Sequence, residues 1–393
     1  MTALLGAFRL GLLYALRHRA QTLVVAVCIA ATVGLPVAAE LVLGHYERQL
    51  GKRADSIPLV AGSKGSRFDL AFSALYFKEQ PIEPVTMRLY NEIAEDPNVT
   101  AVPVHLRFTA KNENVPIVAV GADYFALRGL VPESGTLPLM LGDAVLGAKA
   151  AAEFGLKPGD SLFSDQRELY DLSVPPPLKM RVVGVLAPTA SADDHAVFTG
   201  IETAWVLEGE YHGHADSETI DDSLVMARTA DHVAVSPSMA EYNEITDDNI
   251  ATFHAHGDPS ALPITGVLIF PDDTKAHTLV KARINNKGEY QAVDPGELVG
   301  ELFEVIFRVK VVFDWLIAMM AAVTVLLITL VSLLATRLRA DELATLSRIG
   351  ASRAYLVTLV SVQLVISISL GVIIGLVAAF AALTLLKDLI YTM

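Results

Sequence analysis

The sequence predicts a membrane protein with an α-helical transmembrane part of three spans and a large α+β extracytoplasmic domain inserted between spans one and two. Two observations lead to this fold class. The chain of 393 residues is 52% hydrophobic with a mean hydropathy of +0.45, which is too apolar for an ordinary soluble protein of this length. The apolar residues are also unevenly distributed, because they concentrate in long uncharged stretches near the two ends of the chain.

Three uncharged stretches are long enough to cross a bilayer, since a helical span needs about 20 apolar residues. They are residues 21–39, 315–336 and 354–386. The alternative, a helix buried in a soluble core, rarely exceeds about 14 uncharged residues. The first stretch is also too long for the apolar part of a signal peptide, so we expect it to be retained as a span.

Basic residues beside the spans set the expected orientation, because cytoplasmic flanks are enriched in Lys and Arg. Residues 1–20 contain three arginines and no acid, and residues 337–353 contain four arginines and two acids. Both segments are therefore expected in the cytoplasm, as parts of a multi-pass protein of the cell inner (plasma) membrane. The whole chain has a net charge of −14, so residues 21–336, which contain the region between spans one and two, carry a net charge of −19. An acidic external domain argues against nucleic acid as a partner.

These observations divide the chain into six predicted segments. Residues 1–20 are expected to form an interfacial helix on membrane lipid, since apolar residues recur there at helical spacing. In chain order, the others are span one with its stalk at 21–44, the external domain at 45–296, a stalk with span two at 297–336, a cytoplasmic loop containing a helix at 337–353, and span three at 354–393. Within the external domain, residues 187–260 are rich in Asp, Glu, His, Ser and Thr, which predicts an inserted subdomain or mobile loops.

The external domain alternates strand and helix signals, which predicts an α+β fold. Strands are expected at 57–61, 99–108, 115–120, 179–186, 266–270 and 289–293, and helices at 84–95, 148–154 and 274–284. The single cysteine, Cys28, lies in span one and cannot form a disulfide within the chain. The external domain must therefore be held together by its own apolar core.

The loop at 337–353 contains a short predicted helix with one apolar face. That face consists of positions i, i+1, i+4 and i+7, which are Glu342, Leu343, Leu346 and Ile349. Gly350 can end the helix in the left-handed conformation, and Ser352 can cap the helix that follows. A helix of this kind between two spans is suited to insertion into a groove on a soluble partner, the alternative being a plain connector.

The same loop carries a family resemblance. Residues 342–352, Glu-Leu-Ala-Thr-Leu-Ser-Arg-Ile-Gly-Ala-Ser, resemble the coupling segment of the FtsX/MacB-type permease family of ABC transporters. Ala-Val-Leu-Gly at 144–147, Gly-Leu-Lys-Pro-Gly-Asp at 155–160 and Arg-Val-Val-Gly-Val-Leu at 181–186 resemble that family's MacB-like periplasmic core domain. The order of one span, a large external domain and clustered spans also matches. The family usually has four spans, whereas this sequence has three stretches of sufficient length.

The resemblance implies the permease subunit of an ABC transporter, which couples ATP hydrolysis to extracytoplasmic movement of substrate by mechanotransmission. It implies as partners a dimer of ABC ATPase subunits, a second copy of this permease and a periplasmic binding partner. The ATPase is expected to dock on Glu342, Leu343, Leu346, Arg348, Ile349, Gly350, Ala351 and Ser352.

The chain itself is not expected to be an enzyme. It contains no glycine-rich loop of the form G-x-x-x-x-G-K-[ST], so ATP is expected on a separate subunit and this chain needs no nucleotide of its own. It also contains no Ser-His-Asp or HExxH arrangement that would indicate an intrinsic membrane enzyme. The remaining alternative is a non-transporting FtsX-like regulator of an extracytoplasmic enzyme such as a cell-wall hydrolase.

Six of the ten histidines lie between residues 195 and 256. Four of them form two His-x-His pairs, which are His212 with His214 and His254 with His256. On an extended segment both imidazoles of such a pair face one side, and imidazoles are ligands for zinc and similar ions. The pattern indicates a zinc site, in which the ion could be a substrate, a structural ion or an ion shared with a partner. The alternatives are that these are solvated loop histidines, or that they sense protons, since histidine titrates near neutral pH.

Overall fold

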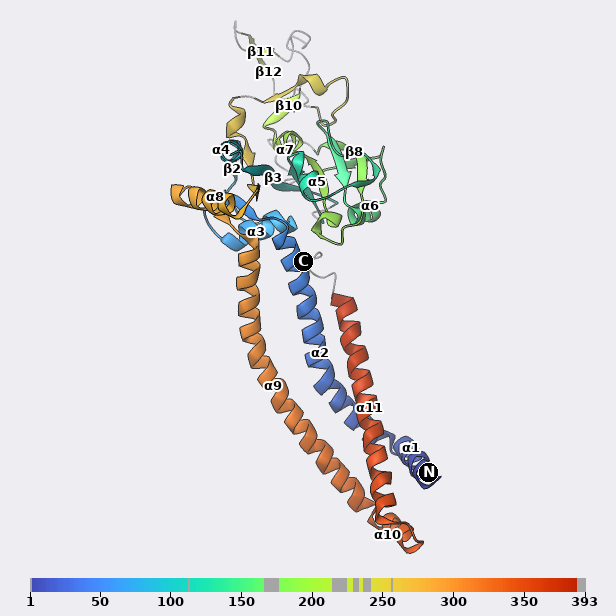
Figure 1. Ribbon diagram of the computed structural model, residues 1–393. Helices are drawn as coiled ribbons and strands as arrows, with labels where there is room; N and C mark the ends of the chain where they lie inside the picture. Colours follow the sequence, from blue (N-terminus) through green and yellow to red (C-terminus); the bar gives the residue numbers. More distant parts are fainter. Residues whose placement is uncertain are drawn as a thin grey trace. The chain divides into compact units, whose positions relative to one another are not determined.

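The computed structural model describes residues 2–111, 114–165, 177–213, 225–228, 233–235, 242–255 and 257–386 (Figure 1). By its internal contacts the chain divides into two compact units. The helical unit contains Met1–Gln49 and Glu301–Met393, and the sheet unit contains Leu50–Gly300.

The sheet unit is built on one mixed β-sheet, in which the described residues contribute ten strands in the order β16-β1-β15-β3-β4-β9-β6-β8-β5, with β7 paired to β8. The β4–β9 and β6–β8 pairs are parallel, and the other neighbours are antiparallel. The strands are β1 (Leu59–Ser63), β3 (Val99–Ala110), β4 (Val115–Val120), β5 (Pro132–Gly135), β6 (Asp143–Leu146), β7 (Ser161–Phe163), β8 (Lys179–Leu186), β9 (Val197–Gly200), β15 (Gly266–Pro271) and β16 (Tyr290–Val293).

Short helices pack on this sheet and bury two apolar clusters. They are α3 (Arg67–Tyr76), α4 (Met87–Ala94), α5 (Asp123–Leu127), α6 (Ala148–Phe154), α7 (Ile201–Glu208) and α8 (Thr274–Lys287), with the 3-10 helices η1 (Ala192–His195), η3 (Ile250–Thr252) and η4 (Pro259–Ala261). One cluster contains Leu89 of α4, Trp205 of α7 and Val280 of α8. The other contains Ala150 of α6 and Met180 of β8. Both clusters bury apolar side chains away from water, and this burial stabilises the sheet unit, which contains no cysteine.

Among the residues that the structure describes, three short strand pairs lie outside the main sheet. They are β2 (Val85–Thr86) with β14 (Pro263–Ile264), β10 (Tyr211–Gly213) with β13 (Phe253–Ala255), and β11 (Val225–Arg228) with β12 (Val233–Val235). The structure differs from the sequence-based boundary of the insertion at 187, because β9 lies between β4 and β6 in the main sheet. The strand β9 has only four residues and follows the polar residues Asp193, Asp194 and His195. The sequence pattern therefore did not mark it as a strand, although three of its four residues are buried.

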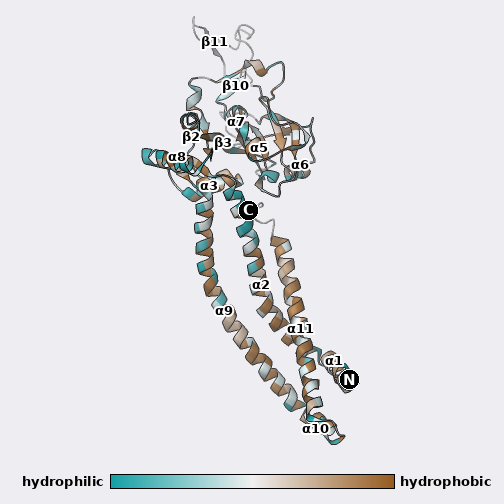
Figure 2. Cartoon of the chain, in the orientation of Figure 1, coloured by the Kyte–Doolittle hydropathy of each residue, from teal (hydrophilic) through white to brown (hydrophobic). Residues whose placement is uncertain are grey.

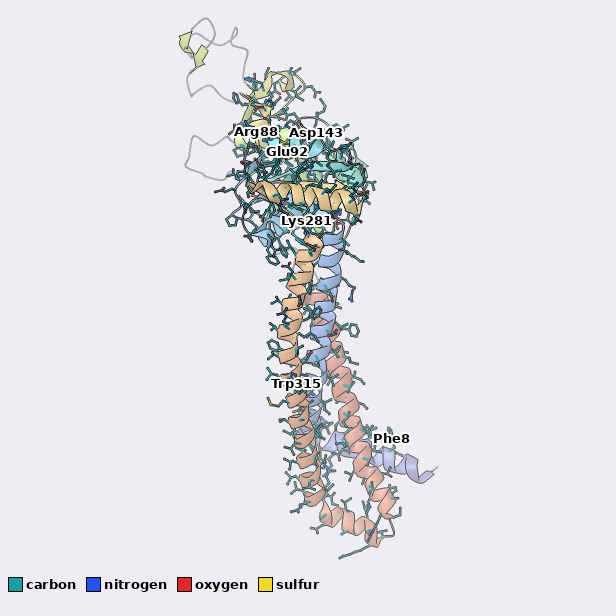
Figure 3. All side chains as sticks on the ribbon, turned by 60° about the vertical axis from the view of Figure 1, so that its left-hand side comes forward. Phe8, Arg88, Glu92, Asp143, Lys281 and Trp315 are labelled. Carbon is teal, nitrogen blue, oxygen red and sulfur yellow. The ribbon has the colours of Figure 1, made fainter. Side chains whose placement is uncertain are left out.

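The helical unit contains α1 (Thr2–Arg17), most of α2 (Arg19–Asp55) and of α9 (Pro295–Leu338), α10 (Ala340–Arg348) and α11 (Arg353–Leu386). By length and composition α2, α9 and α11 could cross a membrane, and they contain the three uncharged stretches. Figure 2 shows apolar residues along most of these helices. Trp315 projects from α9 and is 74% exposed (Figure 3), as suits an aromatic side chain at a membrane interface.

Glycines bring α2 and α11 into close backbone contact. A Cβ on Gly375 of α11 would lie 2.8 Å from the Ala30 carbonyl oxygen and 3.2 Å from the Gly34 nitrogen. A Cβ on Gly371 would lie 2.6 Å from the Ala26 carbonyl oxygen. Helix α11 is unbroken at both glycines, so they serve close packing rather than a bend.

Candidate functional site

The predicted loop helix is α10, which stands between α9 and α11 (Figure 1). It ends in a Schellman motif, because the Ala351 amide donates to the Leu346 carbonyl at 3.0 Å and the Gly350 amide donates to the Ser347 carbonyl at 3.1 Å. Gly350 has φ +104°, a conformation that a residue with a Cβ adopts only with strain. The predicted left-handed glycine is therefore present and gives the helix a defined end.

The apolar residues of α10 differ in exposure. Ile349 at its C-terminal end is 78% exposed, whereas Leu343 and Leu346 are half-buried. The remaining predicted docking residues are exposed or half-buried on the same segment, and they are Glu342, Arg348, Gly350, Ala351 and Ser352. An isoleucine this exposed contributes little to the fold of the chain and is available to a partner.

Side-chain hydrogen bonds fix both ends of this segment. Arg339, just before α10, donates from Nη1 to Oε1 of Gln363 in α11 at 2.7 Å. Ser352 accepts a hydrogen bond from the Tyr355 amide at 3.2 Å, which is the predicted cap of α11. Arg339, Gln363 and Leu343 also line a cavity of about 40 Å³ within the helical unit. Leu343 thus lies against the other helices, while Ile349 faces outward.

A buried ion-pair network lies within the sheet unit, which includes the last residues of α2. Arg53, in the last turn of α2, makes a two-point contact with Asp193 of η1, and its Nη2 lies 3.0 Å from Oδ1. Tyr124 donates to the same Oδ1 at 2.7 Å, and Arg128 lies 3.3 Å from Oδ2. Arg53 also donates from Nε to the Leu75 carbonyl at 2.8 Å. A two-point arginine–carboxylate pair fixes orientation as well as distance.

The positive charges of Arg53 and Arg128 compensate the cost of burying the Asp193 carboxylate. Burial alone would raise the pKa of Asp193, but Arg53 and Arg128 outweigh it and lower that pKa to about 2. Burial, followed by the neighbouring Asp193 charge, raises the pKa of Tyr124, so its hydroxyl stays protonated and donates. The network is a rigid attachment of the end of α2, and sequence analysis did not find it. Arg53 and Asp193 are 140 residues apart, and neither stands in a motif.

The histidine pairs are only partly within the described residues. His212 of β10 and His254 of β13 stand directly opposite each other in an antiparallel pair, with ring centroids 5.2 Å apart. His214 and His256 lie outside the described residues. Among the residues that the structure describes, no group of three or more His, Cys, Asp or Glu side chains could hold a metal ion.

A cleft of about 500 Å³ lies in the sheet unit beside β3, β4 and α7. Its lining is rich in aromatic and sulfur-containing side chains, which are Met87, Tyr90, Phe125, Met140, Trp205 and Tyr211. The lining also includes the polar side chains of Asp123, Glu202 and Thr203, so the cleft presents polar as well as apolar groups.

Comparison with models of protein families shows the family to which the chain belongs. A family model described as MacB-like periplasmic core domain matches residues 22–245. The chain belongs to this family. The MacB-like domain is a component of ABC-type transporter permeases, so the transporter and permease assignment predicted from the sequence is confirmed at this level.

Two solved structures similar to this MacB-like chain are domains of transporters. The periplasmic region of MacB from Actinobacillus actinomycetemcomitans is 12% identical, with a TM-score of 0.36, over 64% of this chain and 95% of that one. The extracellular domain of the noncanonic ABC-type transporter YknZ from Gram-positive bacteria is 12% identical, with a TM-score of 0.33, over 60% of this chain and 98% of that one. No curated protein matches the sequence.

Proposed function

We propose that this chain is the permease subunit of a MacB/FtsX-type ABC transporter in the plasma membrane, which couples ATP hydrolysis on a separate ATPase to extracytoplasmic movement of substrate. The observation that carries the proposal is α10, a helix with a Schellman end and an exposed Ile349. It joins two helices that are apolar enough to cross a membrane. An exposed apolar residue on a short defined helix suits a groove on a soluble partner.

Ile349 is exposed and Leu343 is half-buried, and this difference supports separate roles for the two residues of the α10 segment. Ile349 and the exposed Arg348 are the contacts for the ATPase. Leu343 lines the same cavity as Gln363 of α11, so it positions α10 against the other helices. A displacement of α10 by the partner is then passed to α9 and α11 rather than absorbed within the loop.

The helices α2 and α9 give this displacement a route to the external domain. Each is one unbroken helix that contains residues of both units. The buried pair of Arg53 and Asp193 fixes the end of α2 to the sheet unit, so that the helix cannot turn there without breaking the pair. An attachment of this kind transmits rotation as well as translation.

The composition of the helices supports work on a substrate that is already outside the cytoplasm. Residues 21–39, 315–336 and 354–386 contain no ionisable side chain of Asp, Glu, Lys, Arg or His. Polar substrate pathways through a membrane usually carry such groups. A face-to-face pair of ATPases, as in ABC transporters, would bind two copies of this chain.

The test is a charge substitution on α10 with a matched control. The full chain is coexpressed with ABC ATPases of its own genome, and ATPase copurification and ATP hydrolysis are measured. We expect Ile349→Glu to lower the copurified ATPase by at least about tenfold, as loss of a central interface residue does. Ala344→Glu introduces the same charge on the opposite, exposed side of α10 and should leave the complex intact.

Two results would speak against the proposal. If no ABC ATPase binds the unmodified chain, the proposed partner is wrong. If Ile349→Glu and Ala344→Glu behave alike, α10 is not the docking element. A non-transporting FtsX-like regulator would also bind the ATPase, but a cell-wall hydrolase or its adaptor would then copurify with the external domain.

A further inference from the structure

The cleft in the sheet unit lies at the carboxyl ends of two parallel strands. In the β4–β9 pair Val120 stands opposite Gly200, so the chain leaves both strands at the same edge of the sheet. Gly121 leads from β4 into α5, and Gly200 leads from β9 into α7. Residues of both turns line the cleft of about 500 Å³. Ligands of sheets with parallel strands often bind at this edge, and small-molecule sites have volumes of about 300–1,000 Å³.

We propose that this cleft binds an organic cation that has an apolar body. Two carboxylates line it, Asp123 in the first turn of α5 and Glu202 in the first turn of α7. Both side chains are exposed, and neither forms an ion pair with another described residue. Among the lining residues that the structure describes, none is Lys, Arg or His. A concave site with charge of one sign raises the local concentration of ions of the opposite sign.

The charges of the cleft argue against the other ligand classes. A helix N-terminus attracts anions, but Asp123 and Glu202 already supply negative charge where α5 and α7 begin. These carboxylates would repel an anionic ligand, and a neutral ligand would gain no ionic attraction from them. A metal ion also fits poorly, since no group of three or more His, Cys, Asp or Glu side chains in the described part of the chain could hold one. A protonated amine is the simplest group that these carboxylates can bind.

The rest of the lining supplies apolar surface for the body of the ligand. Met87 and Tyr90 of α4 and Tyr211 of β10 are half-buried, so part of each side chain can reach a ligand. Trp205 of α7 is buried, and its indole nitrogen donates to the Pro263 carbonyl at 2.8 Å, which fixes the ring in the wall. Aromatic faces attract cations, and methionine adapts to varied apolar shapes. These groups beside carboxylates are therefore suited to an ammonium ion on an apolar body.

The rim of the cleft is held in a conformation that exposes apolar side chains. Leu139 is 84% exposed and Met140 is 46% exposed, and both line the cleft. Their amides donate to Oδ2 of Asp143, at 3.2 Å from Leu139 and 3.0 Å from Met140. The Gly142 amide donates to Oγ1 of Thr203 in α7 at 3.0 Å, which ties the rim to the wall. Adjacent apolar side chains that are fixed in solvent indicate a surface that a ligand covers.

The experiment measures binding of tryptamine to the full chain in a nonionic detergent at pH 7 by equilibrium dialysis. Tryptamine has a protonated amine on an aromatic body, and its neutral analogue tryptophol has a hydroxyl in place of the amine. We expect tryptamine to bind at least about tenfold more tightly than tryptophol, since hydrogen bonds between charged groups are the stronger ones. The double variant Asp123→Asn/Glu202→Gln should lose this preference and bind both compounds alike. The assay contains no ATPase, so its outcome is independent of docking on α10.

The matched control is Asp272→Asn/Glu289→Gln, which removes one Asp and one Glu charge from exposed positions of the sheet unit outside the cleft lining. It should keep the preference for tryptamine, which separates binding in the cleft from a general effect of net charge. The proposal is overturned if the unmodified chain does not prefer tryptamine over tryptophol, or if the Asp123→Asn/Glu202→Gln chain keeps the preference. Equal urea midpoints establish that this variant is folded; if they differ, Glu202→Gln alone gives the test, with a partial loss of the preference as the expected result.

Discussion

Asp193 is the residue on which the attachment of α2 to the sheet unit depends. Its carboxylate is fully buried and accepts hydrogen bonds from Arg53, Tyr124 and Ser191. A buried ion pair adds little over an apolar pair of the same size, but removing one partner leaves the other charge buried and unpaired. Substitution of any charged member of the network is therefore expected to destabilise the sheet unit.

We predict that Asp193→Asn lowers the free energy of unfolding of the sheet unit by about 3 kcal/mol at pH 7, since it leaves Arg53 and Arg128 without their carboxylate. Urea unfolding is followed by the fluorescence of the buried Trp205, in a Trp315→Phe background that removes the other tryptophan. The control is Asp247→Asn, which removes a carboxylate that is 82% exposed and should change the free energy by less than about 0.5 kcal/mol.

We also predict that the free energy of unfolding of the sheet unit falls at low pH because of Asp193. The pKa of Asp193 is lowered to about 2, so the stabilisation it gives is complete above its unfolded value of about 4 and is lost as the pH falls toward 2. A shift of this size corresponds to about 2 kcal/mol. This part of the acid destabilisation should be missing in Asp193→Asn; parallel pH profiles of the two chains would contradict the assignment.

At the scale of elements, the contact of α2 with α11 depends on glycine. Because lipid offers no hydrophobic advantage to helix association, close packing of backbones carries more of the stability. Gly34 and Gly375 face each other, and a Cβ on Gly34 would lie 2.9 Å from the Gly375 carbonyl oxygen. Larger side chains at these positions must separate the helices.

We predict that Gly375→Val destabilises the helical unit by about 1–3 kcal/mol, the usual cost of overpacking. Thermal unfolding in detergent measures it as a fall in Tm of at least about 3 °C. Gly51→Val is the matched control, because a Cβ at Gly51 in α2 meets nothing within 4 Å. A Tm that is equal in the two variants would show that the close approach of α2 and α11 is not needed.

Elements with a clear period were predictable, and long-range pairings were not. The expected strands at 115–120 and 179–186 and the helix at 148–154 coincide with β4, β8 and α6. Burial alternates along β8, β4 is an apolar run followed by Gly121, and α6 lies between Gly147 and Gly155. The helix α3 was missed, although Ser66 caps it through the Asp69 amide at 3.2 Å. Its capping signal follows a glycine-rich stretch that indicates a loop.

The functional segments also divide into those that local patterns predict and those that depend on contacts between distant residues. Local rules predicted α10, its left-handed Gly350 and the cap at Ser352, since each depends on residues within one or two turns. The Arg53–Asp193 pair joins elements far apart in the chain, and no local pattern marks it. The two His-x-His pairs were visible in the sequence, but the opposition of His212 and His254 depends on the β10–β13 register.

At the scale of the whole molecule, the proposed function requires α10 and the sheet unit to lie on opposite sides of one membrane. Along the chain, one apolar helix of sufficient length, α9, separates the sheet unit from α10. The arginines at 337–353 favour the cytoplasm for α10, and the acidic character of the external region favours the other side. An ATPase can reach α10 only with this orientation.

We predict that a cysteine on α8 reacts from outside the cell and a cysteine on α10 does not. The background is Cys28→Ala, which removes the single native cysteine. Thr278→Cys in α8 and Thr345→Cys in α10 change exposed threonines, so both thiols are accessible to a reagent in their own compartment. In spheroplasts a membrane-impermeant maleimide should label the Thr278→Cys chain alone, and after lysis it should label both. Labelling of the Thr345→Cys chain before lysis would place α10 outside the cytoplasm and exclude an ATP-driven partner at that helix.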